Sequence, residues 1–236
     1  MPLDIERVKE EVKNYNDSKE LVLCDNLIRR VFSINLIRRI LCIKESEREI
    51  WMRVIILNAL WECNLSNQVE NVASRLWGKW REIQNIIKNL QNISLNHENQ
   101  ERVCDSAEKL LKIIFGDGPN ILVFASKFCH WIAPKVFPII DRKNVRPAIY
   151  QHQVEENVEE NERIVENPNA LTMIDHCIND YQKLIRFYAH ELQAFSRSDI
   201  DDLICYDYDK QPPNYQHTNT ILRVLDKYFW KRGQQL

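Results

Sequence analysis

Glycine is scarce in this chain of 236 residues, and its scarcity argues against several classes of fold. Only Gly78, Gly116, Gly118 and Gly233 are present, whereas an average protein contains roughly 7% glycine. β-Sandwiches and barrels need glycine at their turns, and nucleotide-binding loops need it where the backbone approaches phosphate. Four glycines serve neither class, so we expect an all-α protein.

Long hydrophobic runs and paired cysteines are also missing. The opening residues, MPLDIERVKEEV, lack the apolar region of a secretion signal, and no run of uncharged apolar residues is long enough to form a membrane span. The seven cysteines form no C-x-x-C pair and no Cys/His cluster with zinc spacing. We therefore expect a cytoplasmic protein with reduced cysteines, no membrane span, no metal and no cofactor.

Charge of either sign is nearly balanced. The chain has 32 Lys and Arg against 34 Asp and Glu, a net charge of −2 at pH 7, so the molecule as a whole does not attract nucleic acid. Five acids gather in one stretch, Glu155, Glu156, Glu159, Glu160 and Glu162. Any binding to DNA must therefore use a local basic face.

Apolar residues recur at intervals of three and four along most of the chain, which predicts amphipathic helices. The predicted helices span residues 3–14, 19–42, 47–63, 69–92, 101–115, 121–132, a stretch from about 147, 171–195 and 218–230. Asn120 is the expected cap of the sixth helix. Residues 151–169 are expected to form an exposed, mobile linker, and Ser198 or Asp199 is expected to cap a short turn. Together they predict one irregular multi-helix domain over 1–236.

Residues 116–150 carry the candidate chemistry. On the helix predicted for 121–132, Lys127 lies at the edge of an apolar face, with Phe124 at i−3, His130 at i+3 and Trp131 at i+4. Packing beside aromatic rings removes part of the hydration of an ammonium, which favours the neutral, nucleophilic amine. The apolar run 136–140 then leads to Asp141 at the expected start of the next helix, where backbone N–H groups can hold a carboxylate.

Lys127 followed by Phe137-Pro138-Ile139-Ile140-Asp141 and Val145 resembles the catalytic segment of helix-hairpin-helix DNA glycosylases, most closely the archaeal 8-oxoguanine type. The resemblance covers residues 116–149. It implies two helical lobes with a cleft and a nucleotide flipped out of DNA for excision of its modified base. That base is an oxidised purine or a modified cytosine of phage DNA, the latter implying a role in phage defence.

The resemblance also implies roles for individual residues. Asp141 stabilises the positive charge that develops on the sugar, and Lys127 attacks the anomeric carbon to form a Schiff base. Substrate contacts are expected from Phe124, His130 and Trp131, and DNA-backbone contacts from Arg142, Lys143, Asn144 and Arg146. We expect a monomer whose partner is DNA carrying a modified base.

The segment also departs from the family pattern. The glycines expected in the hairpin, Gly116 and Gly118, lie nine or more residues before Lys127. Lys127 and Asp141 are 141 − 127 = 14 residues apart, about one helical turn less than is usual in the family. No set of cysteines that could bind an iron–sulfur cluster follows. A monofunctional glycosylase, in which Asp141 activates water, is therefore an open alternative. Two others are a non-catalytic helical module that binds nucleic acid or protein, and a helical ribonuclease or toxin built on Arg186 and His190.

Overall fold

The protein is helical throughout the part of the chain that the structure describes. This computed structural model describes residues 3–40, 46–61, 63, 65–118, 121–213 and 216–236, with the side chains of 33–40 and 66 left aside. Within these ranges there are eleven α-helices and no strand, which confirms the all-α prediction. The helices are α1 (Ile5–Asn16), α2 (Lys19–Ile40), α3 (Glu47–Leu60), α4 (Val69–Gly78), α5 (Trp80–Lys88), α6 (Gln100–Phe115), α7 (Leu122–Ile132), α8 (Val145–Glu155), α9 (Ile174–Gln193), α10 (Arg197–Lys210) and α11 (Ile221–Gly233).

Within the described ranges, no helix is both long enough and apolar enough to span a membrane.

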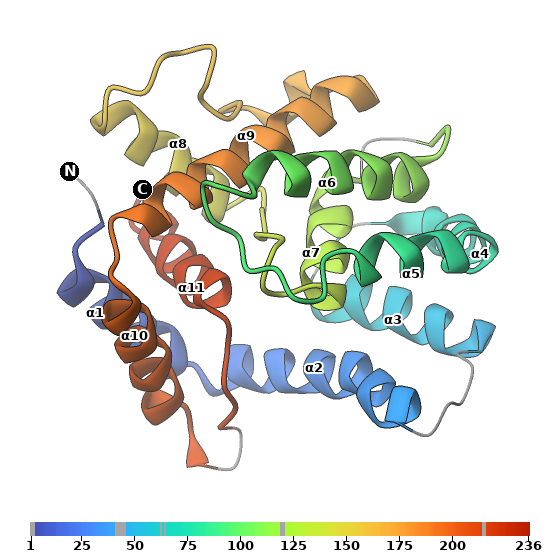
Figure 1. Ribbon diagram of the computed structural model, residues 1–236, viewed down its shortest axis with the longest axis horizontal. Helices are drawn as coiled ribbons and strands as arrows, with labels where there is room; N and C mark the ends of the chain where they lie inside the picture. Colours follow the sequence, from blue (N-terminus) through green and yellow to red (C-terminus); the bar gives the residue numbers. More distant parts are fainter. Residues whose placement is uncertain (1–2, 41–45, 62, 64, 119–120, 214–215) are drawn as a thin grey trace.

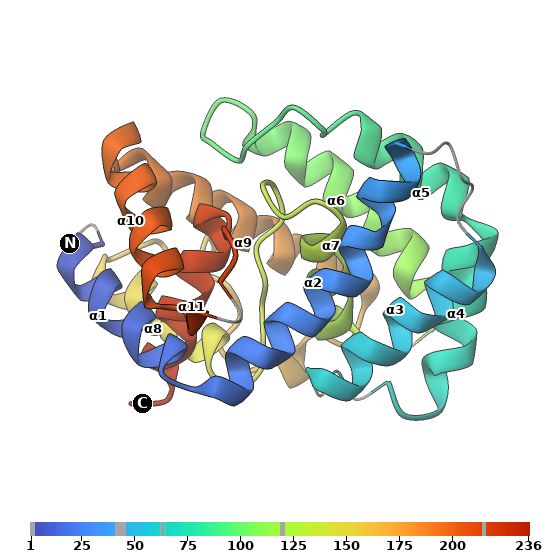
Figure 2. The ribbon, with the colours of Figure 1, turned by 90° about the horizontal axis from the view of Figure 1, so that it is seen from below.

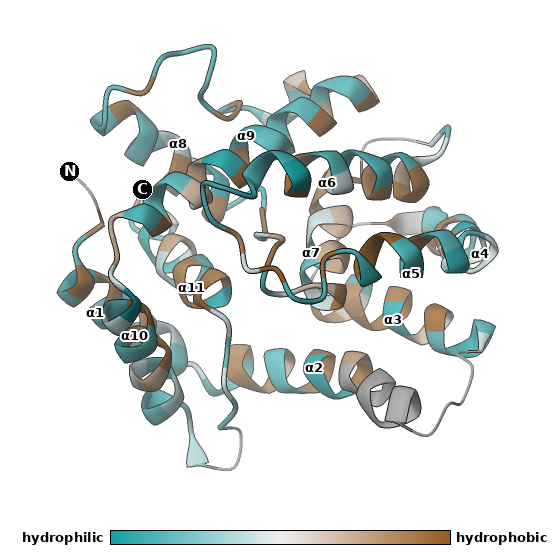
Figure 3. Ribbon diagram, viewed as in Figure 1, coloured by the Kyte–Doolittle hydropathy of each residue, from teal (hydrophilic) through white to brown (hydrophobic). Residues whose placement is uncertain are grey.

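Two helices, α7 and α11, organise the packing. α7 contacts α2, α3 and α6, and α11 contacts α1, α8 and α10, while α9 lies along α6 (Figure 1). Seen from below, α2 crosses in front of α7 (Figure 2). Teal bands run along the outer helix α9, whereas α7 is drawn mostly in brown and pale shades (Figure 3). The helix that carries Lys127 therefore lies in the interior.

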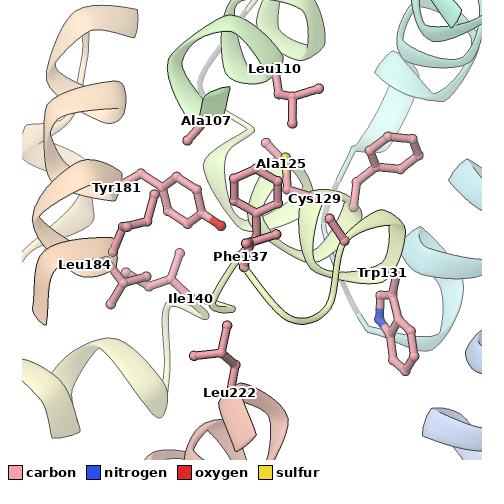
Figure 4. Packing of buried hydrophobic residues seen from close by; sticks show 14 of the residues in the cluster. Ala107, Leu110, Ala125, Cys129, Trp131, Phe137, Ile140, Tyr181, Leu184 and Leu222 are labelled. Carbon is pink, nitrogen blue, oxygen red and sulfur yellow. The ribbon is translucent and has the colours of Figure 1, made fainter. Parts of the chain in front are cut away.

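The burial of α7 corrects the prediction that it has a polar face. Ser126 is 0% exposed, Lys127 7% and His130 1%. The helix is enclosed by its neighbours on one side and by residues 133–144 on the other, and Phe137 and Ile140 of that segment pack into the core beside Tyr181 (Figure 4). Its polar side chains must therefore find partners inside the protein.

Several predicted boundaries are wrong. The helix expected over 69–92 is two helices, α4 and α5, separated at Lys79. Instead of a short turn, a fourteen-residue helix, α10, follows Ser196, whose hydroxyl accepts from the Asp199 N–H. The expected linker is partly structured, because its first residues belong to α8 and the Gln153 side chain is buried and bonds to the Ile164 N–H. The expected cap Asn120 lies outside the described residues.

Charged groups are buried where α1, α10 and α11 meet. Lys227 on α11 is 1% exposed, and its Nζ donates to Asp207 Oδ1 at 2.6 Å and to Asn16 Oδ1 at 2.8 Å. Asp207 also accepts from Asn219 Nδ2 at 2.7 Å and from Gln211 Nε2 at 3.0 Å. These bonds hold three segments that are far apart in sequence, because a buried charge without its partners is costly.

We expect Lys227→Met to lower the free energy of unfolding by about 3–5 kcal/mol, because the substitution leaves the Asp207 carboxylate buried without its cation. Urea denaturation followed by circular dichroism measures the change. Lys112→Met is the matched control, since Lys112 pairs with Glu108 on the surface of α6. An equally small effect of both substitutions would show that the buried pair does not hold these helices.

Candidate functional site

Lys127 is fixed by Trp61 and not by the aromatic neighbours on its own helix. Its Nζ donates to the Trp61 carbonyl oxygen at 2.8 Å and lies 5.2 Å from the centroid of the Trp61 ring. Trp61 directly follows α3, where the last carbonyls of a helix lack intrahelical partners. The ammonium is therefore held by an acceptor and by the negative face of an aromatic ring.

Asp141 lies just before α8, whose N-cap is Asn144, and backbone N–H groups hold its carboxylate as expected. Its Oδ1 accepts from the backbone N–H groups of Lys143 at 2.8 Å, Asn144 at 2.7 Å and Val145 at 3.4 Å. All three bonds fall on Oδ1, so within the described residues Oδ2 accepts none. One oxygen thus fixes the carboxylate against the backbone.

Ser126 joins the two segments that carry Lys127 and Asp141. Its Oγ accepts from the Ile140 N–H at 3.3 Å and lies 3.2 Å from the Ile140 carbonyl oxygen. Tyr181 fixes the same segment from α9 by donating its hydroxyl to the Pro138 carbonyl at 2.7 Å. Because Ser126 and Ile140 are the chain neighbours of Lys127 and Asp141, the contact brings the two candidate residues into one region.

A buried charge cluster, Tyr15, Asp25, Arg223 and Asp226, lies against this region. Arg223 Nη2 donates to Asp25 Oδ1 at 2.8 Å and to the Tyr15 hydroxyl at 2.6 Å, and Nη1 pairs with Asp226. Asp226 Oδ1 has no hydrogen-bond partner in the described structure. Unpartnered polar atoms of this kind are uncommon in protein interiors.

Asp226 experiences the charges of both candidate residues. Burial raises its pKa to about 7, and the neighbouring Asp141 and Asp25 add to the rise, whereas Arg223 and Lys127 oppose it. The Trp61 ring lies 5.2 Å from both the Lys127 ammonium and the Arg223 guanidinium, and so links the cluster to the candidate lysine. Sequence reasoning missed Asp226 because charged residues amid the apolar residues of α11 are typical of a solvent-facing stripe. The available signal was that several charged residues occur in a helix whose other residues are strongly apolar, which indicates buried charge pairs.

An aromatic-lined cavity of about 290 Å³ opens beside the last turn of α7. Of the residues predicted to contact substrate, His130 and Trp131 line it and Phe124 does not; Lys127 and Asp141 do not line it either. The Trp131 ring lies 5.6 Å from the Trp61 ring, which connects the cavity wall to the partner of Lys127. The other lining residues are Arg29, Phe32, Trp80, Ile83, Gln84, Ile87, Ile132, Pro134, Thr218, Asn219, Thr220 and Arg223.

His130 presents a hydrogen-bond acceptor. Its Nδ1 lies 2.7 Å from the Phe137 carbonyl oxygen. Since a carbonyl only accepts, Nδ1 carries the proton and Nε2 has a lone pair. Burial lowers the pKa of His130 to about 3, so the ring is neutral at physiological pH.

Two predicted site residues are placed where they do not fit the roles expected of them. Phe124 is fully buried and stacks on Phe128 with the ring centroids 5.8 Å apart, so its face is not open to a base. Arg146 is 2% exposed and donates to Asp180 at 2.8 Å and to the Val165 carbonyl at 2.6 Å. Its guanidinium is committed inside the protein and is not a phosphate contact.

The other predicted DNA contacts lie at the surface. Arg142 and Lys143 are exposed and Asn144 is half-buried, all directly after Asp141. By contrast, the pair behind the nuclease alternative does not form a site, because Arg186 is bound to Glu101 at 2.8 and 2.9 Å and the His190 side chain is 79% exposed.

Neither a protein-family model, nor a curated protein, nor a solved structure matches this chain. The chemistry of the site is therefore argued from its own residues.

We expect the stability advantage of wild type over Asp226→Asn to fall as pH rises from about 4 to about 7. The pKa of Asp226 is raised to about 7 in the folded protein, whereas its ordinary value is 3.8. Between these two pH values the folded protein keeps a proton that the unfolded chain has released. The contribution of Asp226 to stability is therefore present at low pH and is lost as pH approaches 7. Urea denaturation of both proteins at about pH 5 and about pH 8 measures the difference. A difference that does not change with pH would refute the assignment.

Proposed function

We propose that this chain is a DNA glycosylase of two helical lobes with a cleft, which flips a modified base out of DNA and excises it with Lys127 and Asp141. One observation carries the proposal. Ser126 and Ile140, the chain neighbours of these two residues, are hydrogen-bonded to each other. A lysine and an aspartate chosen from the sequence for one reaction are therefore held in the same region by different elements.

The chemistry follows from the two side chains. Breaking the bond between base and sugar leaves positive charge on the sugar, which the Asp141 carboxylate stabilises through Oδ2, the oxygen that accepts no backbone N–H. The neutral Lys127 amine attacks the anomeric carbon while the base departs with the bonding electrons and takes up a proton. Opening of the sugar ring then gives a Schiff base, whereas attack by water in place of the lysine leaves a simple abasic site.

Lys127 must leave its present partner before it reacts. In the free protein the Trp61 carbonyl and ring hold the charged ammonium. The amine becomes a nucleophile only after losing a proton, and the nearby Asp226, with a pKa of about 7, is suited to exchanging protons at neutral pH. Substrate entry beside Trp61 would therefore release the lysine and change its charge together.

Binding to DNA is proposed to use the surface at the start of α8. Arg142 and Lys143 are exposed there, and arginine and lysine side chains make most contacts to the phosphates of DNA. Because the net charge of the chain is −2, DNA binding requires a local basic surface of this kind. We propose that a monomer binds DNA with these residues beside the strand that carries the modified base.

A non-catalytic binding module is the second candidate, and a specific observation favours it. Lys127 and Asp141 each have a structural role, one as the partner of Trp61 and the other as the acceptor of backbone N–H groups just before α8. A domain that only binds nucleic acid or protein would retain both for stability. Base release therefore has to be measured directly.

We expect borohydride to trap a covalent adduct between wild type and duplex oligonucleotides carrying 8-oxoguanine or modified-cytosine sites, and Lys127→Met to abolish it. Asp141→Asn should slow base release by about a hundredfold or more, the scale on which loss of a preorganised charge acts. Lys135→Met, at an exposed lysine near the end of the same helix, is the control and should trap normally.

Base release without trapping, lost in Asp141→Asn, would mean that water is the nucleophile. No release from a broad panel of modified bases would favour the binding module.

Arg142→Ala and Lys143→Ala should each weaken DNA binding uniformly across sequences. Each should also reduce the slope of log binding constant against log salt by about 1, because one phosphate contact is lost. Fluorescence anisotropy at several salt concentrations measures both. Arg146→Ala is the contrast: its buried pair with Asp180 predicts a loss of stability. Unchanged slopes in the first two variants would place the DNA elsewhere.

A further inference from the structure

The aromatic-lined cavity combines ring walls with arginine side chains. The rings of Phe32, Trp80 and Trp131 line it, and they come from α2, α5 and α7. Its volume of about 290 Å³ is close to the lower end of the range for small-molecule sites. Among the described residues that line it, Arg29 and Arg223 are cationic and none is a carboxylate. Whether these two charges are already neutralised decides what the cavity can hold.

The charge of Arg223 is neutralised within the protein, whereas that of Arg29 is not. Arg223 is bound to the carboxylates of Asp25 and Asp226. Arg29 Nη2 donates to the neutral amide oxygen of Asn219 at 2.9 Å, and no carboxylate of the described chain forms an ion pair with Arg29. Its Nη1 bonds to no described residue either and, unlike Nε, is not enclosed. Burial lowers the pKa of Arg29, because a cation is costly to remove from water without a counter-charge.

His130 adds one hydrogen-bond acceptor to the cavity. Its Nδ1 donates to the Phe137 carbonyl oxygen at 2.7 Å, so Nε2 keeps a lone pair. His130 lines the cavity, and its Nε2 accepts no hydrogen bond from the described part of the chain. The cavity thus presents one cationic donor and one neutral acceptor between aromatic rings. A matching ligand carries a negative charge, an N–H or O–H donor and a flat apolar body.

The single unpaired charge selects among ligands. One guanidinium balances one negative charge, as on a carboxylate. A phosphate monoester carries about two negative charges at neutral pH, more than Arg29 alone neutralises. An ammonium group would meet no carboxylate among the described lining residues, so amines and zwitterions are disfavoured.

We infer that this cavity binds an aromatic monocarboxylate whose ring bears an N–H or hydroxyl group. The carboxylate pairs with Arg29 Nη1, the ring donor bonds to His130 Nε2, and the ring packs against the aromatic walls. Such a ligand is a small molecule with neither sugar nor phosphate, so the inference goes beyond the proposed function and does not depend on it. The site adjoins the candidate lysine, because the Trp131 ring lies 5.6 Å from the ring of Trp61, the partner of Lys127.

Three probes of nearly the same shape test the inference by isothermal titration calorimetry at neutral pH. They are indole-3-acetate, its neutral amide indole-3-acetamide, and benzofuran-3-acetate, which has a ring oxygen in place of the N–H. Wild type should bind indole-3-acetate at least about tenfold more tightly than the amide, because a hydrogen bond between charged groups is the stronger one. It should also prefer indole-3-acetate to the benzofuran by at least about fivefold, because the ring oxygen leaves His130 Nε2 facing another acceptor.

Arg29→Gln should reduce the preference for the acid over the amide to about twofold or less, because the charge that recognises the carboxylate is gone. Its preference for the indole over the benzofuran should persist, since His130 is unchanged. Arg30→Gln is the matched control and should retain both preferences. Arg30 is the next residue of α2, is exposed and does not line the cavity.

Equal binding of acid and amide by wild type, or binding of none of the probes, would overturn the inference whatever the variants do. Retention of the full acid preference by a folded Arg29→Gln, checked by circular dichroism, would also overturn it. Equal binding of the indole and the benzofuran would refute the ring donor. If Arg29→Gln does not fold, the two ratios measured on wild type decide. Probe binding breaks no bond in DNA, so its outcome is separate from that of the glycosylase assay.

Discussion

The pairing of buried charges along α11 is the constraint on which the rest of this structure depends. Eight consecutive residues of α11, from Leu222 to Phe229, are buried, and Arg223, Asp226 and Lys227 are among them. A buried charge is stable only beside its partners, so Arg223 fixes Asp25 of α2 and Lys227 fixes Asp207 of α10. The last helix thereby joins the first two to α10 and forms part of the wall of the cavity.

Trp61 connects the charge cluster of α11 to the candidate site. Its ring lies 5.2 Å from both the Lys127 ammonium and the Arg223 guanidinium and 5.6 Å from the Trp131 ring, while its carbonyl accepts from Lys127. One residue at the end of α3 therefore contacts the candidate nucleophile, the charge cluster and the cavity wall. The three therefore share one indole as a common neighbour.

Most helices could be predicted because apolar residues recur along them, whereas α10 could not be predicted because acidic residues interrupt its apolar ones. α10 has the sequence RSDIDDLICYDYDK, in which acidic residues interrupt the apolar ones, and only Leu203 and Asp207 are buried. Its stability comes from the Ser196 cap and from contacts with α1 and α11 and not from an apolar stripe. Residues 151–169 look exposed by composition, yet Gln153 and Arg163 bond to backbone groups within that segment.

The sequence by itself determined the all-α class, the position of most helices and the binding of the Asp141 carboxylate by backbone N–H groups just before α8, because each depends on residues within about one turn of chain. Only the tertiary structure decided that Lys127 is bound to Trp61, 66 residues away, that Arg223 holds Asp25, 198 residues away, and that Arg146 is committed to Asp180. A helical wheel places a side chain relative to its own helix alone. Which charge is buried, which is paired and where a cavity remains depend on how distant helices pack, since burial is a property of the whole core.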